Sequence, residues 1–402
     1  MIERKQKQKG NPVLATGDWR LAAERPTWAE IDLGALAENY KALAELMAPA
    51  DVPKPRFATR NPRVIPVIKA NAYGHGMVPV ARALAAAGAS MFAVFYVDEA
   101  LQLRRAGISQ DILVMGTSWI GQEAAVIENR LTVTVDTLEC VRSLEISARS
   151  RAASIPVHLK VDTGMARLGV RWDSMEPLLN ALRNAKGVRL KGVFSHLSSA
   201  EEIDSAFTQK QIRRFEQSLA SVQESGLECG EIHFANSAGL LYFNSLQHWS
   251  ARAGIAIYGY YPDPGRSPIK LRPALCLKSR VGPIKSIEAG EPVGYNRKYH
   301  ASRKMRLTTL CLGYADGFNR GLGNRNSVII HDKPAPVIGA VSMDMIAVDL
   351  TDLPEAGEGE EAIVLGSSAH CQITPHDWAD TLETIPYEVL CAIATRVPRI
   401  YI

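Results

Sequence analysis

Lys69 stands where an apolar run meets a glycine-punctuated turn, in the stretch Val-Ile-Lys-Ala-Asn-Ala-Tyr-Gly-His-Gly at residues 67–76. A lysine at the end of a buried strand can point into a pocket that excludes water. Burial lowers the pKa of an amine, which leaves more of it neutral and able to form a Schiff base with an aldehyde. Taken alone, the pattern is more typical of a lysine whose ammonium group reaches water. Lys69 is therefore a candidate catalytic residue only in combination with the other reactive side chains of the sequence.

Four further reactive side chains accompany later apolar runs: Arg167, His196, Ser237 and Arg252. Each has an ordinary alternative. Either arginine is compatible with an ion pair, the histidine with a hydrogen-bonded place in the core, and the serine with a helix cap. A helix N-terminus with serine and glycine also binds phosphate, so a capping role for Ser237 does not exclude function.

The elements that must position these residues begin with eight short apolar runs. Most of the segments between the runs have helical spacing. Continuous apolar strands of this length are typical of parallel sheets buried on both faces. Strand followed by helix, eight times, predicts an α/β fold in the form of a (β/α)8 barrel; a doubly wound open sheet is the alternative, because counting does not show closure. The runs are residues 64–69, 91–97, 112–115, 131–135, 157–161, 190–195, 231–235 and 252–258.

The rhythm changes after residue 261, where prolines and a glycine interrupt the chain and strand-like runs follow without helices. This predicts a barrel at residues 25–273 and a mainly antiparallel β domain at residues 274–402. One helix is expected to close the chain, with Thr374 as its N-cap and Pro375 at its first position. Residues 28–33 read as a strand and 34–48 as a helix, and neither fits the eightfold count. The basic residues 1–24 predict a flexible extension.

In a barrel of this kind, active sites lie at the C-terminal ends of the strands. Lys69, Arg167, His196, Ser237 and Arg252 would then share one rim. An amine nucleophile, phosphate-binding amides and arginines in one place predict a phosphorylated aldehyde cofactor, pyridoxal phosphate.

Composition narrows the class of protein. The net charge of +4 over 402 residues is too small to indicate a nucleic-acid partner, and no apolar stretch is long enough to span a membrane. The six cysteines form no C-x-x-C pair, which favours free thiols in a reducing cytoplasm over disulfides or a metal site.

Eight stretches of this sequence resemble alanine racemases, the fold-type III pyridoxal-phosphate enzymes. The resemblance covers nearly everything from Arg25 to Ile402 and implies a barrel followed by a β domain that residues 28–33 would join. The stretches are residues 67–76, 159–169, 194–200, 234–239, 252–259, 313–317, 341–344 and 386–389.

The resemblance implies a role for each matching residue. Lys69 would form the imine with the cofactor, Arg252 would face the pyridine nitrogen, and Arg167 would bond the phenolic oxygen. His196 and Asn236 would complete the cofactor site. The phosphate ligands would be Tyr73, Ser237, Tyr387 and the amides of Gly254 and Ile255.

Two implied residues belong to the second subunit of a homodimer. Tyr314 resembles the second catalytic base, and Met343 resembles a residue whose backbone meets the substrate carboxylate. Lys160 matches a lysine that is often carbamylated in this family. Asn296 departs from the family, which usually has a small residue there, and this puts substrate preference in doubt.

The resemblance implies a racemase that interconverts L-alanine and D-alanine and supplies D-alanine for peptidoglycan; a serine or broad-specificity racemase is the alternative. Lys69 and Tyr314 would act on opposite faces of the substrate, and we hypothesise that His196 and Arg252 form a polar chain behind Tyr314. Two other classes compete: an aldolase-like barrel that uses Lys69 without a cofactor, and a carrier that holds the cofactor without turnover. Neither explains all of Arg252, Tyr314 and Met343.

Overall fold

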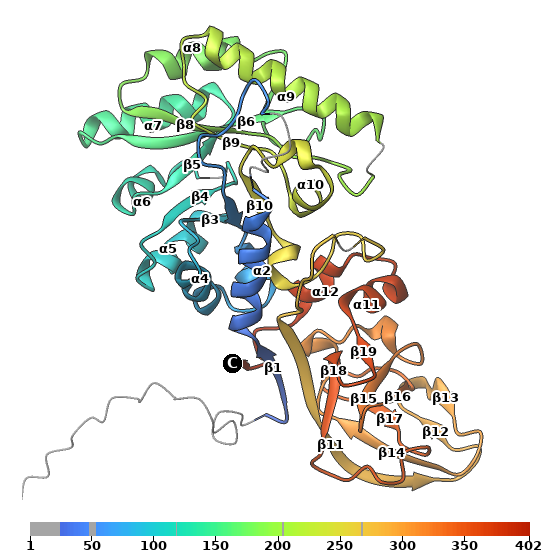
Figure 1. Ribbon diagram of the computed structural model, residues 1–402. Coiled ribbons are helices and arrows are strands. Elements are labelled where there is room, and N and C mark those ends of the chain that lie inside the picture. The colour runs from blue at the N-terminus through green and yellow to red at the C-terminus, as the bar shows by residue number, and fades with distance from the viewer. Residues whose placement is uncertain (1–24, 48–53, 118, 203–204, 267) are drawn as a thin grey trace, which may run out of the picture.

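A computed structural model describes residues 25–47, 54–117, 119–202, 205–266 and 268–402. The chain forms a ring of strands and helices followed by a second, strand-rich domain (Figure 1). The predicted extension at residues 1–24 lies outside the described residues, as does residue 48 of the first predicted helix. Among the residues described, no helix is both long and apolar enough to cross a bilayer.

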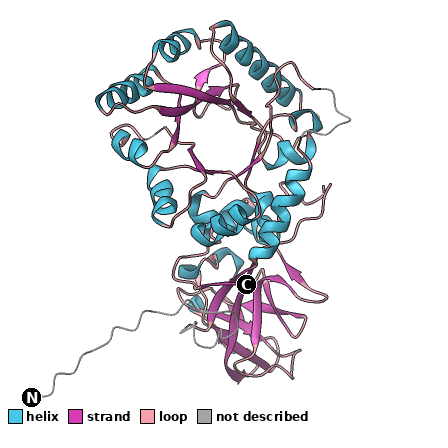
Figure 2. Ribbon diagram, turned by 60° about the vertical axis from the view of Figure 1, so that its left-hand side comes forward, coloured by secondary structure: helices cyan, strands magenta, loops and turns pink. Residues whose placement is uncertain are grey.

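Eight parallel strands form the barrel. Six of them pair in the order β3-β4-β5-β6-β8-β9, and β10 pairs with β2. Single bridges from Val67 to Ala93 and from His233 to Ser250 close the ring. Figure 2 shows this ring end-on, with helices outside it. Closure confirms the predicted barrel and excludes an open sheet. The strands are β2 (Val64–Pro66), β3 (Met91–Val94), β4 (Asp111–Val114), β5 (Thr132–Val135), β6 (Ile155–Asp162), β8 (Val188–Phe194), β9 (Glu231–His233) and β10 (Ala251–Ala253).

Helices alternate with these strands because their apolar residues recur at helical spacing and face the ring. On α9, the buried Phe215 stacks on Phe234 with ring centroids 4.7 Å apart. Side-chain caps start several of the helices; for example, Thr137 accepts from the Cys140 amide, and Ser205 accepts from the Thr208 amide. The helices are α4 (Met77–Ala86), α5 (Val97–Arg105), α6 (Glu123–Glu128), α7 (Leu138–Ser150), α8 (Glu176–Asn184), α9 (Ala206–Glu224) and α10 (Ser237–Tyr242).

The last predicted barrel strand was too long. Only Ala251–Ala253 pairs as a strand, and a 3-10 turn, η2 (Ile255–Tyr258), follows. Gly254 separates the two with φ −102° and ψ −98°, which lies outside both the strand and the helix regions. The backbone therefore leaves the strand conformation at Gly254, directly after the strand ends.

The second domain is built on one nine-stranded sheet, in the order β19-β18-β15-β16-β17-β14-β11-β1-β20, and β18 also pairs with β11. The N-terminal strand β1 (Thr27–Ile31) runs antiparallel to β11 and parallel to β20. It leads directly into α2 (Leu33–Glu45), which Asp32 caps. The other strands are β11 (Leu275–Ile287), β14 (Met305–Leu310), β15 (Ser327–Ile330), β16 (Lys333–Ile338), β17 (Ile346–Asp349), β18 (Glu361–Ser367), β19 (Gln372–Ile373) and β20 (Arg399–Tyr401).

The end of the chain differs from the prediction of one closing helix. Thr374 caps α11 (Pro375–Leu382) as expected, through a reciprocal bond with Asp377. A second helix, α12 (Pro386–Ala392), follows, and β20 then returns to the sheet. Glu383 ends α11 in the left-handed conformation with φ 55°. The new direction brings α12 against the loop after Lys69, where a Cβ on Gly74 would overlap the carbonyl oxygen of Leu390.

Candidate active site

Lys69 lies two residues beyond the bridge from Val67 to β3 and is half-buried at the rim of the barrel. Its ammonium nitrogen is 5.5 Å from the centre of the Phe95 ring. Burial and then the nearby charge of Arg167 lower the pKa of Lys69, while the Glu99 carboxylate partly offsets this. The result is an amine with more of the neutral, nucleophilic form than an exposed lysine has.

A left-handed turn, α3 (Lys69–Tyr73), holds this lysine. The φ angles of Ala70, Asn71, Ala72 and Tyr73 are 52°, 52°, 53° and 51°. Such a conformation costs an L-residue roughly 1–2 kcal/mol, so surrounding contacts must stabilise it.

Three side chains supply those contacts. Glu99 accepts from the Ala70 amide at 2.7 Å with one oxygen, and from the Phe95 and Tyr96 amides at 2.8 and 3.1 Å with the other. The ring of His75 bonds the carbonyls of residues 72 and 73 through Nδ1. Arg399, from β20, donates to the Gly74 carbonyl at 3.0 Å. Hydrogen bonds from these three side chains therefore hold the strained turn in place.

Tyr73, Ser237 and Gly254 form a compact cradle. Asn236 caps α10 by accepting from the Gly239 amide, so Ser237 is not the cap. The Ser237 hydroxyl instead accepts from the amides of Gly254 at 3.0 Å and Ala256 at 3.3 Å. A Cβ on Gly254 would lie 2.5 Å from the phenolic oxygen of Tyr73.

Two other predicted phosphate ligands adjoin this cradle. Ile255 lies between the two amides that bond Ser237 and is fully buried. The rings of Tyr387, on α12, and Tyr73 are 6.0 Å apart. Hydroxyl groups and backbone amides converge here, which is a donor set suited to a phosphate.

Arg252 is the centre of a buried polar network. Its Nη2 donates to the Ser195 carbonyl at 2.7 Å and lies 3.0 Å from Nδ1 of His196, while its Nη1 lies 2.8 Å from Nδ1 of His233. Burial and then Arg167 lower the pKa of Arg252 to about 9, so the guanidinium is still charged at neutral pH.

A guanidinium only donates, so both histidines must accept at Nδ1 and carry their proton on Nε2. Burial and the charge of Arg252 keep the pKa of His196 and of His233 well below its ordinary value, which agrees with neutral rings. Nε2 of His233 lies 2.7 Å from Nδ1 of His158. The Nε2–H of His233 therefore donates to His158, and the chain of hydrogen bonds continues into the barrel.

Lys160 is buried beside this network, with its nitrogen 4.5 Å from the centre of the Phe194 ring. Burial, then Arg252, then Arg167 lower its pKa far below the ordinary value. Arg167 itself is exposed, and it acts electrostatically on Lys69, Lys160 and Arg252. The rim thus gathers the predicted cations around one small volume.

Tyr314 and Met343 lie in the second domain and point to the surface. Their side chains are 43% and 52% exposed. In the described part of the chain, the Tyr314 phenol has no hydrogen bond, ion pair or ring contact. The predicted link between His196 and Arg252 is present, but Tyr314 of the same chain does not join it.

Comparison with known proteins decides the family. The chain matches the alanine racemase N-terminal domain at residues 31–262 and the alanine racemase C-terminal domain at residues 274–401. This chain belongs to the alanine racemase family. An alanine racemase from Symbiobacterium thermophilum is 40% identical over 94% of this chain and 97% of its own length.

Solved structures of alanine racemases agree with this membership. The enzyme from Bacillus anthracis, with bound L-Ala-P, superposes with a TM-score of 0.85 at 34% identity, over 94% of this chain and 96% of that one. The enzyme from Bartonella henselae, with covalently bound pyridoxal phosphate, gives 0.81 at 29% identity, over 94% and 99%.

Asn296, which was predicted from the sequence to depart from the family pattern, has a backbone conformation that suits asparagine. Its φ is 57°, a left-handed conformation that asparagine tolerates better than most residues with a side chain. Asparagine therefore keeps the turn that a glycine would allow.

Two histidines of the Arg252 network were missed from the sequence. His158 stands two residues before Lys160 on β6, and alternation along a strand puts both side chains on one face. That spacing was a usable signal. The second, His233, gave none, because its place beside Arg252 depends on the bridge between β9 and β10.

Proposed function

We propose that this protein is a pyridoxal-phosphate-dependent alanine racemase that interconverts L-alanine and D-alanine. One observation carries the proposal. Lys69, on its strained turn, lies on the same rim of the barrel as the cradle of Tyr73, Ser237 and Gly254. Family membership supports the same chemistry. A serine or broad-specificity racemase is the second candidate, since Asn296 differs from the usual family residue.

The residues present fit the cofactor. The missing Cβ at Gly254 leaves room for a hydroxyl and amide donors around one anion, and Tyr387 stands beside them. Tyr73, Ser237, Tyr387 and the amides of Gly254 and Ile255 would hold the phosphate. His196 and Asn236 would support the cofactor site, Arg252 would face the ring nitrogen and Arg167 the phenolic oxygen. Bound pyridoxal phosphate supplies a conjugated ring that delocalises the negative charge left when the Cα proton departs.

Racemisation requires removal of the Cα proton from one face and return of a proton to the other. Lys69 would act as the base on one face and Tyr314 on the opposite face. A phenol has an ordinary pKa of about 10, so Tyr314 needs help to act near neutral pH. The Nε2–H that Arg252 fixes on His196 is a donor suited to stabilising a phenolate.

The active unit would be a homodimer. Tyr314 and Met343 are displayed at the surface of their own chain, which favours their entry into the site of a second copy. There Met343 would meet the substrate carboxylate through its backbone. The free cysteines favour a cytoplasmic location, and D-alanine would serve peptidoglycan synthesis.

Racemisation of a panel of L-amino acids, with and without added pyridoxal phosphate, tests the proposal. We expect alanine to be racemised fastest and only with cofactor. Borohydride should fix the cofactor on the peptide that contains Lys69. Labelling without racemisation would indicate a carrier, and turnover of carbonyl substrates without cofactor would indicate an aldolase. Either result would overturn the proposal.

A further inference from the structure

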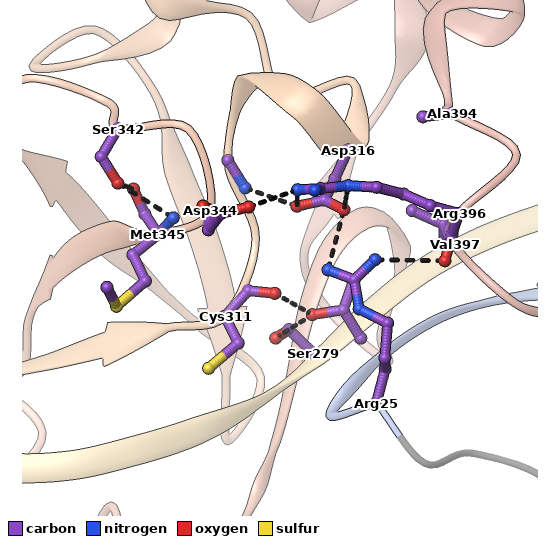
Figure 3. A network of polar contacts seen from close by, with 12 residues as sticks. Arg25, Ser279, Cys311, Asp316, Ser342, Asp344, Met345, Ala394, Arg396 and Val397 are labelled. Carbon is purple, nitrogen blue, oxygen red and sulfur yellow. Dashed lines mark hydrogen bonds and ion pairs between the residues drawn. The ribbon is translucent and has the colours of Figure 1, made fainter.

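The Asp316 carboxylate is fully buried two residues after Tyr314, in the turn η4 (Tyr314–Asp316). Arg396 donates two hydrogen bonds to this carboxylate, from Nε to Oδ1 at 2.7 Å and from Nη2 to Oδ2 at 3.0 Å. The same Nη2 also donates to Asp344 at 2.8 Å. Figure 3 shows Arg396 between the two carboxylates.

We infer that Arg396 is a positioning residue that locks the turn carrying Tyr314 to the loop carrying Met343. The inference rests on the proposed function, because it concerns the second base and the substrate-carboxylate contact of that reaction. Arg396, Asp316 and Asp344 are called the carboxylate clamp below.

Backbone hydrogen bonds join the two segments directly. The Tyr314 amide donates to the Ser342 carbonyl at 3.0 Å, and the Ala315 amide donates to the Met343 carbonyl at 3.1 Å. Gly313 packs so closely that a Cβ there would overlap the Met343 carbonyl. The carboxylate clamp adds a side-chain link to this backbone contact, because Asp316 is the last residue of the turn and Asp344 follows Met343.

Further bonds fix Asp316 itself. Its carboxylate accepts from the Gly313 amide at 2.9 Å, which caps the turn, and from Arg25 at 2.9 Å. Arg25 also donates to the Arg396 carbonyl at 3.1 Å. The turn is thereby tied to the C-terminal segment, whose Ala394 amide donates to the Asp316 carbonyl.

Within its own chain, the Tyr314 phenol has no partner among the described residues, so that chain positions it through the backbone alone. A base that is displaced by about 1 Å loses roughly 100-fold in rate. The carboxylate clamp supplies the rigidity that an exposed phenol lacks. Its loss should therefore slow the proton transfer at Tyr314 more than the transfer at Lys69.

Substrate isotope effects test this in the intact holoenzyme. The equilibrium constant between enantiomers is one, so kcat/KM changes equally in both directions and cannot show which face is affected. With alanine deuterated at Cα, slowing the Tyr314 step should raise the isotope effect in the direction in which Tyr314 removes the proton. In the opposite direction the isotope effect should fall toward unity.

Two variants make the test robust. Arg396→Lys keeps the charge but loses the planar fork, and we expect roughly a 100-fold fall in kcat/KM. Asp344→Ala removes only the arm to the Met343 loop, at a side chain that is 56% exposed, so the protein should fold. Its isotope effects should shift in the same opposed way. Asp352→Ala breaks an exposed pair with Arg303 and is the matched control, expected to change nothing.

Several results would overturn the inference. They are activity that falls while both isotope effects stay unchanged, isotope effects that rise together, or a clamp variant that behaves like the control. The absorbance of bound cofactor in each variant reports whether the Lys69 site is still loaded. Absence of racemisation by the unmodified protein would instead refute the proposed function.

Discussion

The phenolic oxygen of Tyr73 lies 2.5 Å from the position that a Cβ on Gly254 would occupy. Tyr73 cannot easily retreat, because its ring is buried and packs 4.8 Å from the ring of Tyr258. The contact joins the turn after the first barrel strand to the residue after the last, at the place where the cofactor phosphate is proposed to bind.

Gly254→Ala should therefore weaken cofactor binding. Overpacking costs about 1–3 kcal/mol, which corresponds to roughly a 5–150-fold rise in the dissociation constant for pyridoxal phosphate. Titration of the apoenzyme, followed by cofactor absorbance, measures this. Gly357→Ala is the control, because a Cβ there meets its nearest atom at an ordinary 3.5 Å. Equal affinity in the two variants would contradict the proposed cradle.

Tyr314→Phe should slow racemisation strongly without unfolding the protein. General-base catalysis contributes roughly 100- to 10,000-fold, whereas the exposed hydroxyl has no partner in the described chain to lose. Because Lys69 would still act on its face, one enantiomer should exchange its Cα hydrogen with deuterated water while the other does not. Tyr295→Phe alters another exposed tyrosine of the same domain and should be neutral. Exchange of both enantiomers would exclude a face-specific base.

We expect Glu99 to raise the pKa of Lys69 through its charge and to hold the Lys69 turn through its hydrogen bonds. Glu99→Gln removes the charge that raises the pKa of Lys69, so that pKa should fall further, and it replaces one of the two accepting oxygens with an NH2 group that cannot accept. Glu99→Asp keeps the charge but is too short to bond Ala70, Phe95 and Tyr96 together.

The rate at which apoenzyme recombines with pyridoxal phosphate, measured against pH, separates these effects. The rate should reach its plateau at lower pH in Glu99→Gln than in the unmodified protein, because the neutral amine is the nucleophile. Glu99→Asp should lower the plateau without that shift. Identical profiles in all three proteins would show that Glu99 does not act on Lys69.

Asp316 should make stability depend on pH. Burial by itself would raise its pKa, but bonds from Arg396, the Gly313 amide and Arg25 outweigh this and lower it. A carboxylate whose pKa is lowered on folding stabilises the protein above its unfolded pKa of about 3.9, and that stability is lost as pH falls further.

Asp316→Asn should cost roughly 1–3 kcal/mol near neutral pH, as expected when hydrogen bonds to a buried charged group are lost while the arginine partners stay partly exposed. Urea unfolding of both proteins between pH 7 and pH 3 measures the difference, which should shrink below about pH 4. A constant difference across the range would show that charge is not the cause.

Lys160 should react with carbon dioxide. Its lowered pKa leaves a neutral amine, and a carbamate there would place an anion beside the cations Arg252 and Arg167. Carbon-13 bicarbonate should give a carbamate carbonyl resonance that is lost in Lys160→Met and kept when the exposed Lys186 is changed to methionine. A resonance that survives Lys160→Met would assign the modification elsewhere.

The sequence allowed the barrel and most of the rim to be predicted, because both follow from local patterns. Alternation of apolar runs with helical segments revealed the eight strands, and Lys69 and Arg252 stand next to two of them. The left-handed turn at Ala70 was not predictable, since alanine prefers the right-handed region and the bonds that hold it come from Glu99 and Arg399. The carboxylate clamp depends on a pairing between residues 316 and 396, which no local pattern encodes.

The reach of β20 to the Lys69 loop bears on how the enzyme is made in the cell. Arg399 bonds the Gly74 carbonyl across 325 positions of sequence, and Gly76 has no Cβ because the Tyr401 hydroxyl fills that space. A ribosome makes the reactive lysine long before it makes Arg399 and Tyr401. Until then the Lys69 turn has only its contacts with Glu99 and His75, so we expect the fully held lysine to form only after both domains have been made.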